Sequence, residues 1–145
     1  MTYKEEKWKS VQNDHLVRVT YRDTDQMNVV YYANYLVWFE MGRTELLRQT
    51  GHTYKEFEDT GHALPVIHCV CEYKKPARYD DLIRIRTRIL HLSRASIIFG
   101  YQIINENTGE VIAEGETRHA IITKEGRIAR AGNMLEQWFE QEILK

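Results

Sequence analysis

The chain has 145 residues, 43% of them hydrophobic and 28% charged, a composition typical of a single globular domain rather than a disordered segment. Twenty Lys and Arg residues balance 21 Asp and Glu residues, so the net charge of −1 provides no general attraction to nucleic acid. No apolar run approaches the length of a membrane span, and the N-terminus lacks the apolar stretch of a signal peptide. We therefore expect one domain over residues 1–145, in the cytoplasm, with no nucleic-acid partner and no membrane span.

The first third of the chain predicts an extension, a strand and a long helix. Residues 1–13 are expected to form the extension, and mixed apolar and polar residues over 15–21 predict the strand. Residues 29–49 predict the helix, whose first half is apolar on nearly every side, as in a helix enclosed by other structure. Gly51 favours its end. One small sheet is insufficient to cover such a helix, so we expect a second subunit to supply the remaining cover.

The rest of the chain is rich in predicted strands. After a polar connection over 53–61, strands are expected over 64–75, 82–92, 96–105 and 111–123. Residues 82–92 alternate apolar side chains with arginines, which predicts one buried face and one outer face. A hairpin turn is predicted at Asn107-Thr108-Gly109, and a C-terminal helix over 133–144 from Asn133 and Glu136 in capping-box spacing. This order predicts an α+β fold in which one antiparallel sheet curls around one helix.

Two aspartates stand between the first strand and the predicted helix. Asp23 and Asp25 lie where a helix N-terminus would offer free backbone N–H groups and a dipole that favour developing negative charge. A carboxylate beside such donors is suited to attacking or hydrating a carbonyl. The structural alternative is an N-cap. The residues alone support the two readings about equally.

Other reactive side chains have mainly structural interpretations. Cys69 and Cys71 share one strand face, too far apart to bond to each other, and we expect buried, reduced thiols. The histidines show no ligand spacing, so no metal site is predicted, and His119 is expected to be a buried, hydrogen-bonded core residue. Glu40 is expected to pair with Arg43 or Thr44 on one helical face.

Three segments carry a recognisable pattern. They are Tyr21-Arg22-Asp23-Thr24-Asp25 with Val29-Val30-Tyr31-Tyr32, Asn34 and Tyr35, then the run 75–82, then the run 113–120. Together, and in this order, they resemble the hotdog-fold acyl-CoA thioesterases of the 4-hydroxybenzoyl-CoA thioesterase family. The resemblance implies a five-stranded antiparallel sheet wrapped around a long central helix. It also implies homodimers or homotetramers with active sites at the subunit interface.

The resemblance also implies the site residues. Asp25 falls on the catalytic carboxylate, acting as nucleophile or as the base that activates a water, and the backbone amide of Tyr32 falls on the group that polarises the thioester carbonyl. Asp23 is expected to hold the loop. Around Asp25 we expect substrate contacts from Asn28, Val29 and Tyr31. Asn28 stands where many members carry Gly, and Asn is the next most tolerant residue of positive φ.

The basic strip Arg84, Arg86 and Arg88 has two interpretations: it binds the phosphates of coenzyme A, or it is a solvated outer sheet face. The implied function is hydrolysis of an acyl-CoA to a carboxylic acid and free coenzyme A. No Gly-rich phosphate loop or dinucleotide fingerprint is present, so no cofactor is expected and coenzyme A is part of the substrate. The alternatives are an acyl-carrier-protein thioesterase and a non-catalytic protein that binds acyl groups or coenzyme A.

Overall fold

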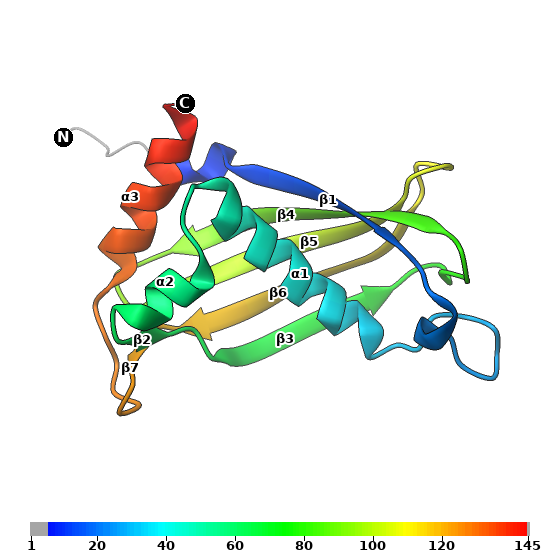
Figure 1. Ribbon diagram of the computed structural model, residues 1–145, viewed down its shortest axis with the longest axis horizontal. Helices are drawn as coiled ribbons and strands as arrows, with labels where there is room; N and C mark the ends of the chain where they lie inside the picture. The colour runs from blue at the N-terminus through cyan, green and yellow to red at the C-terminus, as the bar shows by residue number, and fades with distance from the viewer. Residues whose placement is uncertain (1–5, 145) are drawn as a thin grey trace.

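The computed structural model describes residues 6–144, which form one five-stranded antiparallel sheet with a long helix lying along one face (Figure 1). The strand order is β1-β4-β5-β6-β3, so β1 and β3 are the two edges. This confirms the predicted α+β architecture. The main elements are β1 (Gln12–Arg18), α1 (Asn34–Gln49), β3 (Val66–Tyr73), β4 (Leu82–Leu92), β5 (Ser96–Asn105) and β6 (Val111–Ala120).

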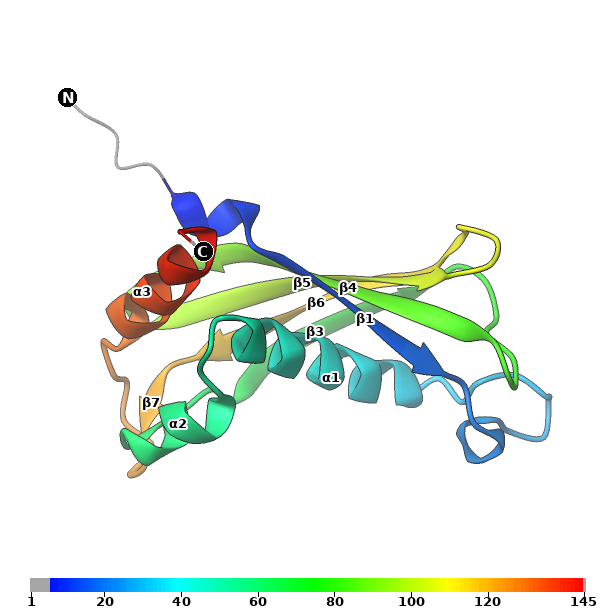
Figure 2. The ribbon, with the colours of Figure 1, turned by 45° about the horizontal axis from the view of Figure 1, so that its top comes forward.

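Most of the smaller elements gather at one end of the sheet, whereas η2 lies at the other end, next to the loop that leads into α1 (Figure 1). Figure 2 shows α3 beside η1 at the first of these ends, with α2 and β7 nearby. Trp8 of η1 is buried, so part of the predicted extension belongs to the core, whereas residues 1–5 lie outside the described part. The elements are η1 (Lys7–Ser10), η2 (Tyr21–Asp23), α2 (Tyr54–Asp59), β2 (His62–Ala63), β7 (Ile122–Thr123) and α3 (Gly132–Ile143).

The core lies between α1 and the inner face of the sheet. The predicted bounds of β4 and β5 are confirmed, and their inner side chains, Ile83, Ile85, Ile89, Phe99 and Tyr101 among them, are buried. Phe39 of α1 stacks on Tyr101 with ring centroids 4.3 Å apart. At Gly42 a Cβ would lie 2.2 Å from the Thr87 hydroxyl, so the missing side chain lets α1 approach β4.

Several predicted boundaries are wrong. The helix begins at Asn34 rather than at residue 29, because Val30 forms a bridge with Thr24 and donates its N–H to the Ala77 carbonyl instead of joining a helical turn. The first strand occupies 12–18, and the strand expected over 64–75 is the shorter β3, preceded by the unpredicted β2 at 62–63. The strand expected over 111–123 divides into β6 and β7. Helix α2 replaces part of the expected connection, and α3 begins at Gly132 without the predicted side-chain cap.

Edge strand β3 is the exposed apolar margin of the sheet. Its side chains Val66, Ile67, Val70 and Tyr73 are 46%, 65%, 37% and 47% exposed. Helix α1 packs mainly on β1 and β4, so the side toward β3 is less covered. The predicted burial of the cysteines is therefore wrong: Cys69 on β3 is exposed and Cys71 is half-buried. Within residues 6–144, no helix has the length and apolarity that a bilayer crossing needs.

Candidate active site

Asp23 fixes the loop that leads into α1. Its Oδ2 accepts hydrogen bonds from the Thr20 backbone N–H at 2.8 Å and the Thr20 hydroxyl at 2.9 Å. Its carbonyl oxygen accepts from the Tyr31 N–H at 2.9 Å and from the Asn34 side-chain amide at 2.8 Å. The carboxylate is thus engaged in local structure, which confirms the loop-holding role predicted for Asp23.

Asp25 occupies a tight turn and leaves part of its carboxylate free. Oδ1 accepts from the Met27 backbone N–H at 2.8 Å, and the backbone of Asp25 bonds to Val29 and Asn28 at 2.9 and 3.0 Å. Asn28 takes φ 64°, the left-handed conformation that Asn tolerates. The N-cap position of α1 belongs to Ala33. The N-cap alternative for Asp25 is therefore wrong, and its side chain caps only its own turn.

The backbone N–H of Tyr32 is a free donor at the approach to α1. Tyr32 lies two residues before the helix rather than in its first turn. The chain here is already turning, because Asn34 N–H bonds to Tyr31 O at 2.9 Å and Tyr35 N–H to Tyr32 O at 3.3 Å. Within the described residues, no acceptor bonds to the Tyr32 N–H, so it is a free backbone donor immediately before the helix N-cap.

Asp25 and Tyr32 line one cleft. The cleft has a volume of about 350 Å³ and opens on the surface between the loop before α1 and the end of β3. The remaining lining is mostly apolar and aromatic, with two lysines at the rim: Met27, Val29, Val30, Tyr35, Tyr73, Lys74, Lys75 and Pro76. A carboxylate and a free amide on one mostly apolar wall are suited to holding and polarising an ester-like carbonyl. Of the other predicted contacts, Val29 lines the cleft and Asn28 shapes its turn.

Phenol groups lie in and beside the cleft: Tyr35 and Tyr73 line it, whereas Tyr31, a predicted substrate contact, is not among its lining residues. A hydrogen bond with Tyr32, and to a smaller extent the charge of Asp25, raises the pKa of Tyr31, whose ring lies 4.7 Å from that of Tyr32. Burial raises the pKa of Tyr35 and of Tyr73. These hydroxyls therefore act as hydrogen-bond donors at neutral pH rather than as bases.

Tyr73 is a site residue that sequence reasoning missed. Its hydroxyl donates to the carbonyl oxygen of Tyr32 at 2.8 Å, and its ring packs against that of Tyr35 at 4.9 Å. An aromatic residue at the end of a predicted strand gives no sign of this role, because its partners lie about 40 positions away in the chain.

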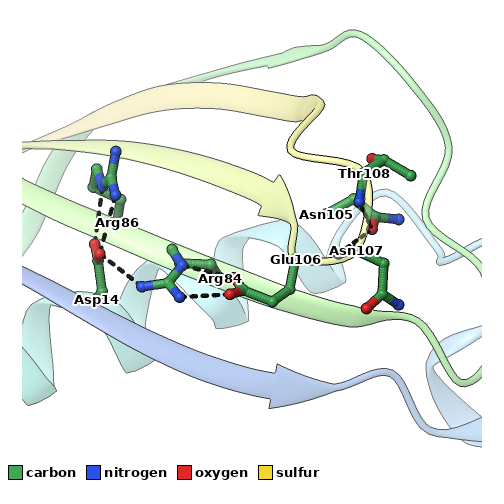
Figure 3. Close-up of polar contacts among 7 residues, drawn as sticks. All are labelled: Asp14, Arg84, Arg86, Asn105, Glu106, Asn107 and Thr108. Carbon is green, nitrogen blue, oxygen red and sulfur yellow. Dashed lines mark hydrogen bonds and ion pairs between the residues drawn. The ribbon is translucent and has the colours of Figure 1, made fainter.

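Arg84 and Arg86 of the basic strip lie on the face of the sheet turned away from α1 (Figure 3), and none of the three arginines lines the cleft. Arg84 bonds to both Glu106 oxygens at 2.7 and 2.6 Å and to Asp14 at 2.9 Å, and Arg86 bonds to Asp14 at 3.0 and 3.1 Å. Hydrogen bonding from Arg86 and Arg84 lowers the pKa of Asp14 against the opposing effect of burial. Arg88 is exposed and has no ion pair among residues 6–144. A role for the strip with coenzyme A phosphates stays a prediction.

His119 belongs to a buried chain of hydrogen bonds. Its Nδ1–H donates to the Leu64 carbonyl at 2.9 Å, and its Nε2 accepts from the Thr117 hydroxyl at 2.7 Å. The Thr117 oxygen in turn accepts from the Tyr101 hydroxyl at 2.6 Å. Burial lowers the pKa of His119 to about 4, so the ring is neutral and both nitrogens are engaged. This confirms the predicted core role.

A second cavity, of about 100 Å³, lies between the middle of α1 and the start of β3. Glu40 and Arg43 line it from the helix, with Leu64, Phe99 and His119 opposite. The predicted pairing of Glu40 with Arg43 or Thr44 is wrong, because among the described residues Glu40 forms no ion pair or side-chain hydrogen bond with either. Among the same residues, no three His, Cys, Asp or Glu side chains gather as metal ligands.

Comparison with known proteins identifies the neighbours of this chain. The Thioesterase-like superfamily matches residues 19–139. The Bacillus subtilis protein YneP, which bears the provisional name of an acyl-CoA thioesterase, is 38% identical over 109 residues, 75% of this chain and 78% of that protein. The acyl-CoA thioester hydrolase YbgC of Escherichia coli O6:H1 is 40% identical over 93 residues, 63% of this chain and 69% of that one. The DHNA-CoA thioesterase structure from Staphylococcus aureus superposes with a TM-score of 0.82 at 28% identity, covering 92% and 89% of the two chains.

Proposed function

Because this chain belongs to the Thioesterase-like superfamily and has its hotdog fold, we propose that it hydrolyses the thioester of an acyl-CoA to a carboxylic acid and free coenzyme A. The observation that supports this most directly is the pairing of the Asp25 carboxylate with the free Tyr32 amide in one cleft. The relatives leave the acyl group open. The proposal includes a cytoplasmic location, as the sequence predicts.

The chemistry divides between these two groups. The Tyr32 N–H donates to the thioester carbonyl oxygen and stabilises the negative charge that develops on it. Asp25 either attacks the carbonyl carbon, giving a mixed anhydride that water then opens, or takes a proton from a water that attacks directly. In both routes the carbon–sulfur bond breaks, coenzyme A leaves as its thiol after protonation, and the acyl group leaves as a carboxylate.

The proposal also includes a homo-oligomer, a dimer or a tetramer. An exposed edge strand presents unpaired backbone N–H and C=O groups, and β3 adds exposed Val66, Ile67 and Val70 beside them. The opposite edge, β1, is richer in polar side chains. The face of α1 turned to solvent carries exposed Leu36. A second copy that pairs with β3 satisfies the backbone groups and covers these apolar side chains.

Thiol release measured with DTNB across acyl-CoAs of increasing chain length and across aryl-CoAs tests the activity. We expect turnover of at least one of these substrates, and a fall of at least about 10²-fold in kcat for Asp25→Asn in a folded protein. Asp23→Asn is the matched control and is expected to lower stability more than kcat. Turnover only of acyl groups carried by an acyl-carrier protein would favour that alternative, and near-normal turnover by Asp25→Asn would refute the mechanism.

A further inference from the structure

Arg43 is a half-buried cation among neutral groups. It lines the smaller cavity, where the other polar side chain facing it from the sheet is neutral His119. Burial raises the pKa of Tyr101, and the charge of Arg43 opposes that rise, so the guanidinium lies near this phenol as well. A guanidinium held against neutral and apolar groups without a counter-ion is costly. Within residues 6–144 Arg43 forms no ion pair, so its position favours an anion supplied from outside the chain.

Glu40 is the complementary charge, and it has no ion pair with any residue of 6–144. It lies one turn before Arg43, is exposed, and lines the same cavity. Elsewhere on α1 the spacing of three residues does produce an ion pair, because Glu45 and Arg48 meet at 2.5 Å. The two unpaired charges on one helix form a self-complementary surface: a copy rotated by a twofold axis offers a carboxylate to each guanidinium.

The position of Glu40 and Arg43 relative to β3 indicates where the twofold axis between two copies would lie. Phe39 of α1 lies against Gly115 of β6, which pairs with Cys71 of β3, whereas Arg43, one turn later, lines the cavity with His119, which pairs with Val66. The stretch of α1 that carries Glu40 and Arg43 therefore passes beside Cys69. Cys69 is in the middle of Val66–Tyr73. A twofold axis that pairs two β3 strands antiparallel passes near the middle of each strand, and side chains close to an axis meet their symmetry mates.

We propose that Glu40 of each subunit pairs with Arg43 of the other, so that two reciprocal ion pairs flank the twofold axis of a dimer joined through β3. This inference rests on the homo-oligomer of the proposed function and specifies its interface. It also completes the Asp25 cleft: antiparallel pairing about the middle of β3 brings the first residues of the partner's β3 next to Tyr73, which borders that cleft. The exposed apolar side chains at that strand start then close its open side.

Charge reversal tests the pairing. Glu40→Lys alone and Arg43→Glu alone each place like charges across the axis twice, and we expect the dimer dissociation constant to rise at least about 100-fold, by light scattering and sedimentation. Mixing the two variants restores both pairs in a heterodimer, and so does combining both changes in one chain. Glu45→Lys, which removes a surface pair of the same helix, is the control and is expected to leave dimerisation unchanged.

Mixing the two single variants distinguishes an ion pair between subunits from an ion pair within one chain. If the double variant dimerises but the mixture of single variants does not, the pair lies within one chain and the proposal fails. Should Arg43→Glu not fold, Glu40→Gln mixed with Arg43→Gln serves the same purpose, because only their heterodimer keeps one intact pair. Equal amounts of homo- and heterodimer would then overturn the proposal.

The remaining outcomes concern other anions and the activity itself. Unchanged dimerisation of Glu40→Lys, with a raised KM of Arg43→Gln only for acyl-CoAs that carry a distal carboxylate, would assign Arg43 to a ligand and overturn the ion pairs. Absence of acyl-CoA hydrolysis by the unaltered dimer would count against the proposed activity, while the dissociation constants would still decide the interface.

Discussion

The hydroxyl of Tyr73, the last residue of β3, donates a 2.8 Å hydrogen bond to the carbonyl oxygen of Tyr32. The bond ties the open edge of the sheet to the backbone that carries the free amide of the cleft. The rings reinforce it, since Tyr73 packs edge-on against Tyr32 at 6.5 Å and against Tyr35 at 4.9 Å. We therefore expect Tyr73 to act as a positioning residue that orients the Tyr32 backbone and its N–H donor.

Tyr73→Phe keeps the ring packing and removes only the hydroxyl. Losing one hydrogen bond of about 1 kcal/mol that orients the donor is expected to lower kcat several-fold, up to about tenfold, with KM nearly unchanged. Steady-state kinetics on the best acyl-CoA, together with the melting temperature, measure this. An unchanged kcat would show that the Tyr32 backbone is held well enough without Tyr73.

The turn at Asn28 offers a test of backbone conformation. With φ at 64°, Asn28→Gly places a residue that adopts this angle freely, so the free energy of unfolding should change by no more than about 0.5 kcal/mol. Asn28→Ala keeps a Cβ in the left-handed region but removes the short polar side chain that lets Asn adopt it, and is expected to cost about 1 kcal/mol. Urea unfolding of both variants measures the difference. Equal stability of the two would mean that the turn rearranges.

Asp14 joins the first strand to two arginines of β4. Its pKa is lowered mainly by hydrogen bonds from Arg86 and Arg84, so the stability it contributes is present above the usual pKa of an Asp and is lost as the pH falls through the lowered value. At neutral pH, Asp14→Asn should cost about 1 kcal/mol, because the pairs are partly solvated. The cost should shrink in high salt. Denaturant melts at two salt concentrations measure it, with Glu114→Gln, whose Lys74 pair spans 3.6 Å, as the weaker control.

Periodic features of this fold were readable from the sequence, and features set by distant partners were not. The bounds of β4 and β5 could be predicted because buried side chains alternate with less buried ones over most of each strand. The start of α1 does not, since an apolar run is compatible with a helix, and only the bond from Val30 to Ala77, 47 positions on, shows that it is extended. The short helix α2 was not predicted, because its sequence is mostly polar and only Phe57 of the helix is buried.

The candidate site shows the same division. Asp25 and the Tyr32 amide were found from a local motif that resembles a family, and the structure places both on one cleft. The partners of Arg84 could not be foreseen, because Asp14 lies 70 residues away on a neighbouring strand. Cys69 is exposed because β3 is an edge strand. The residues of a single strand do not reveal its place in the sheet, so this exposure could not be predicted.

His119 predicts how stability depends on pH. Its pKa is about 4 in the folded protein, because burial penalises the charged ring, against about 6.5 in the unfolded chain. The unfolded state therefore binds a proton first as the pH falls. The contribution of neutral His119 is fully present above pH 6.5 and is lost between about 6.5 and 4, at most about 3 kcal/mol.

The groups around His119 define the variant that isolates this effect. The ring meets the Thr117 hydroxyl, the Leu64 carbonyl and the edge of Phe99, and the Arg43 charge further disfavours protonation. His119→Gln can donate and accept hydrogen bonds but does not titrate, so its stability should fall less than that of the unaltered protein as the pH drops from 6.5 to 4.5. Denaturant melts across this range measure the difference between the two proteins, in which the shared carboxylates cancel. Parallel curves would mean that His119 is charged in the folded state, and the direction of donation along the Tyr101–Thr117–His119 chain would then have to be reversed.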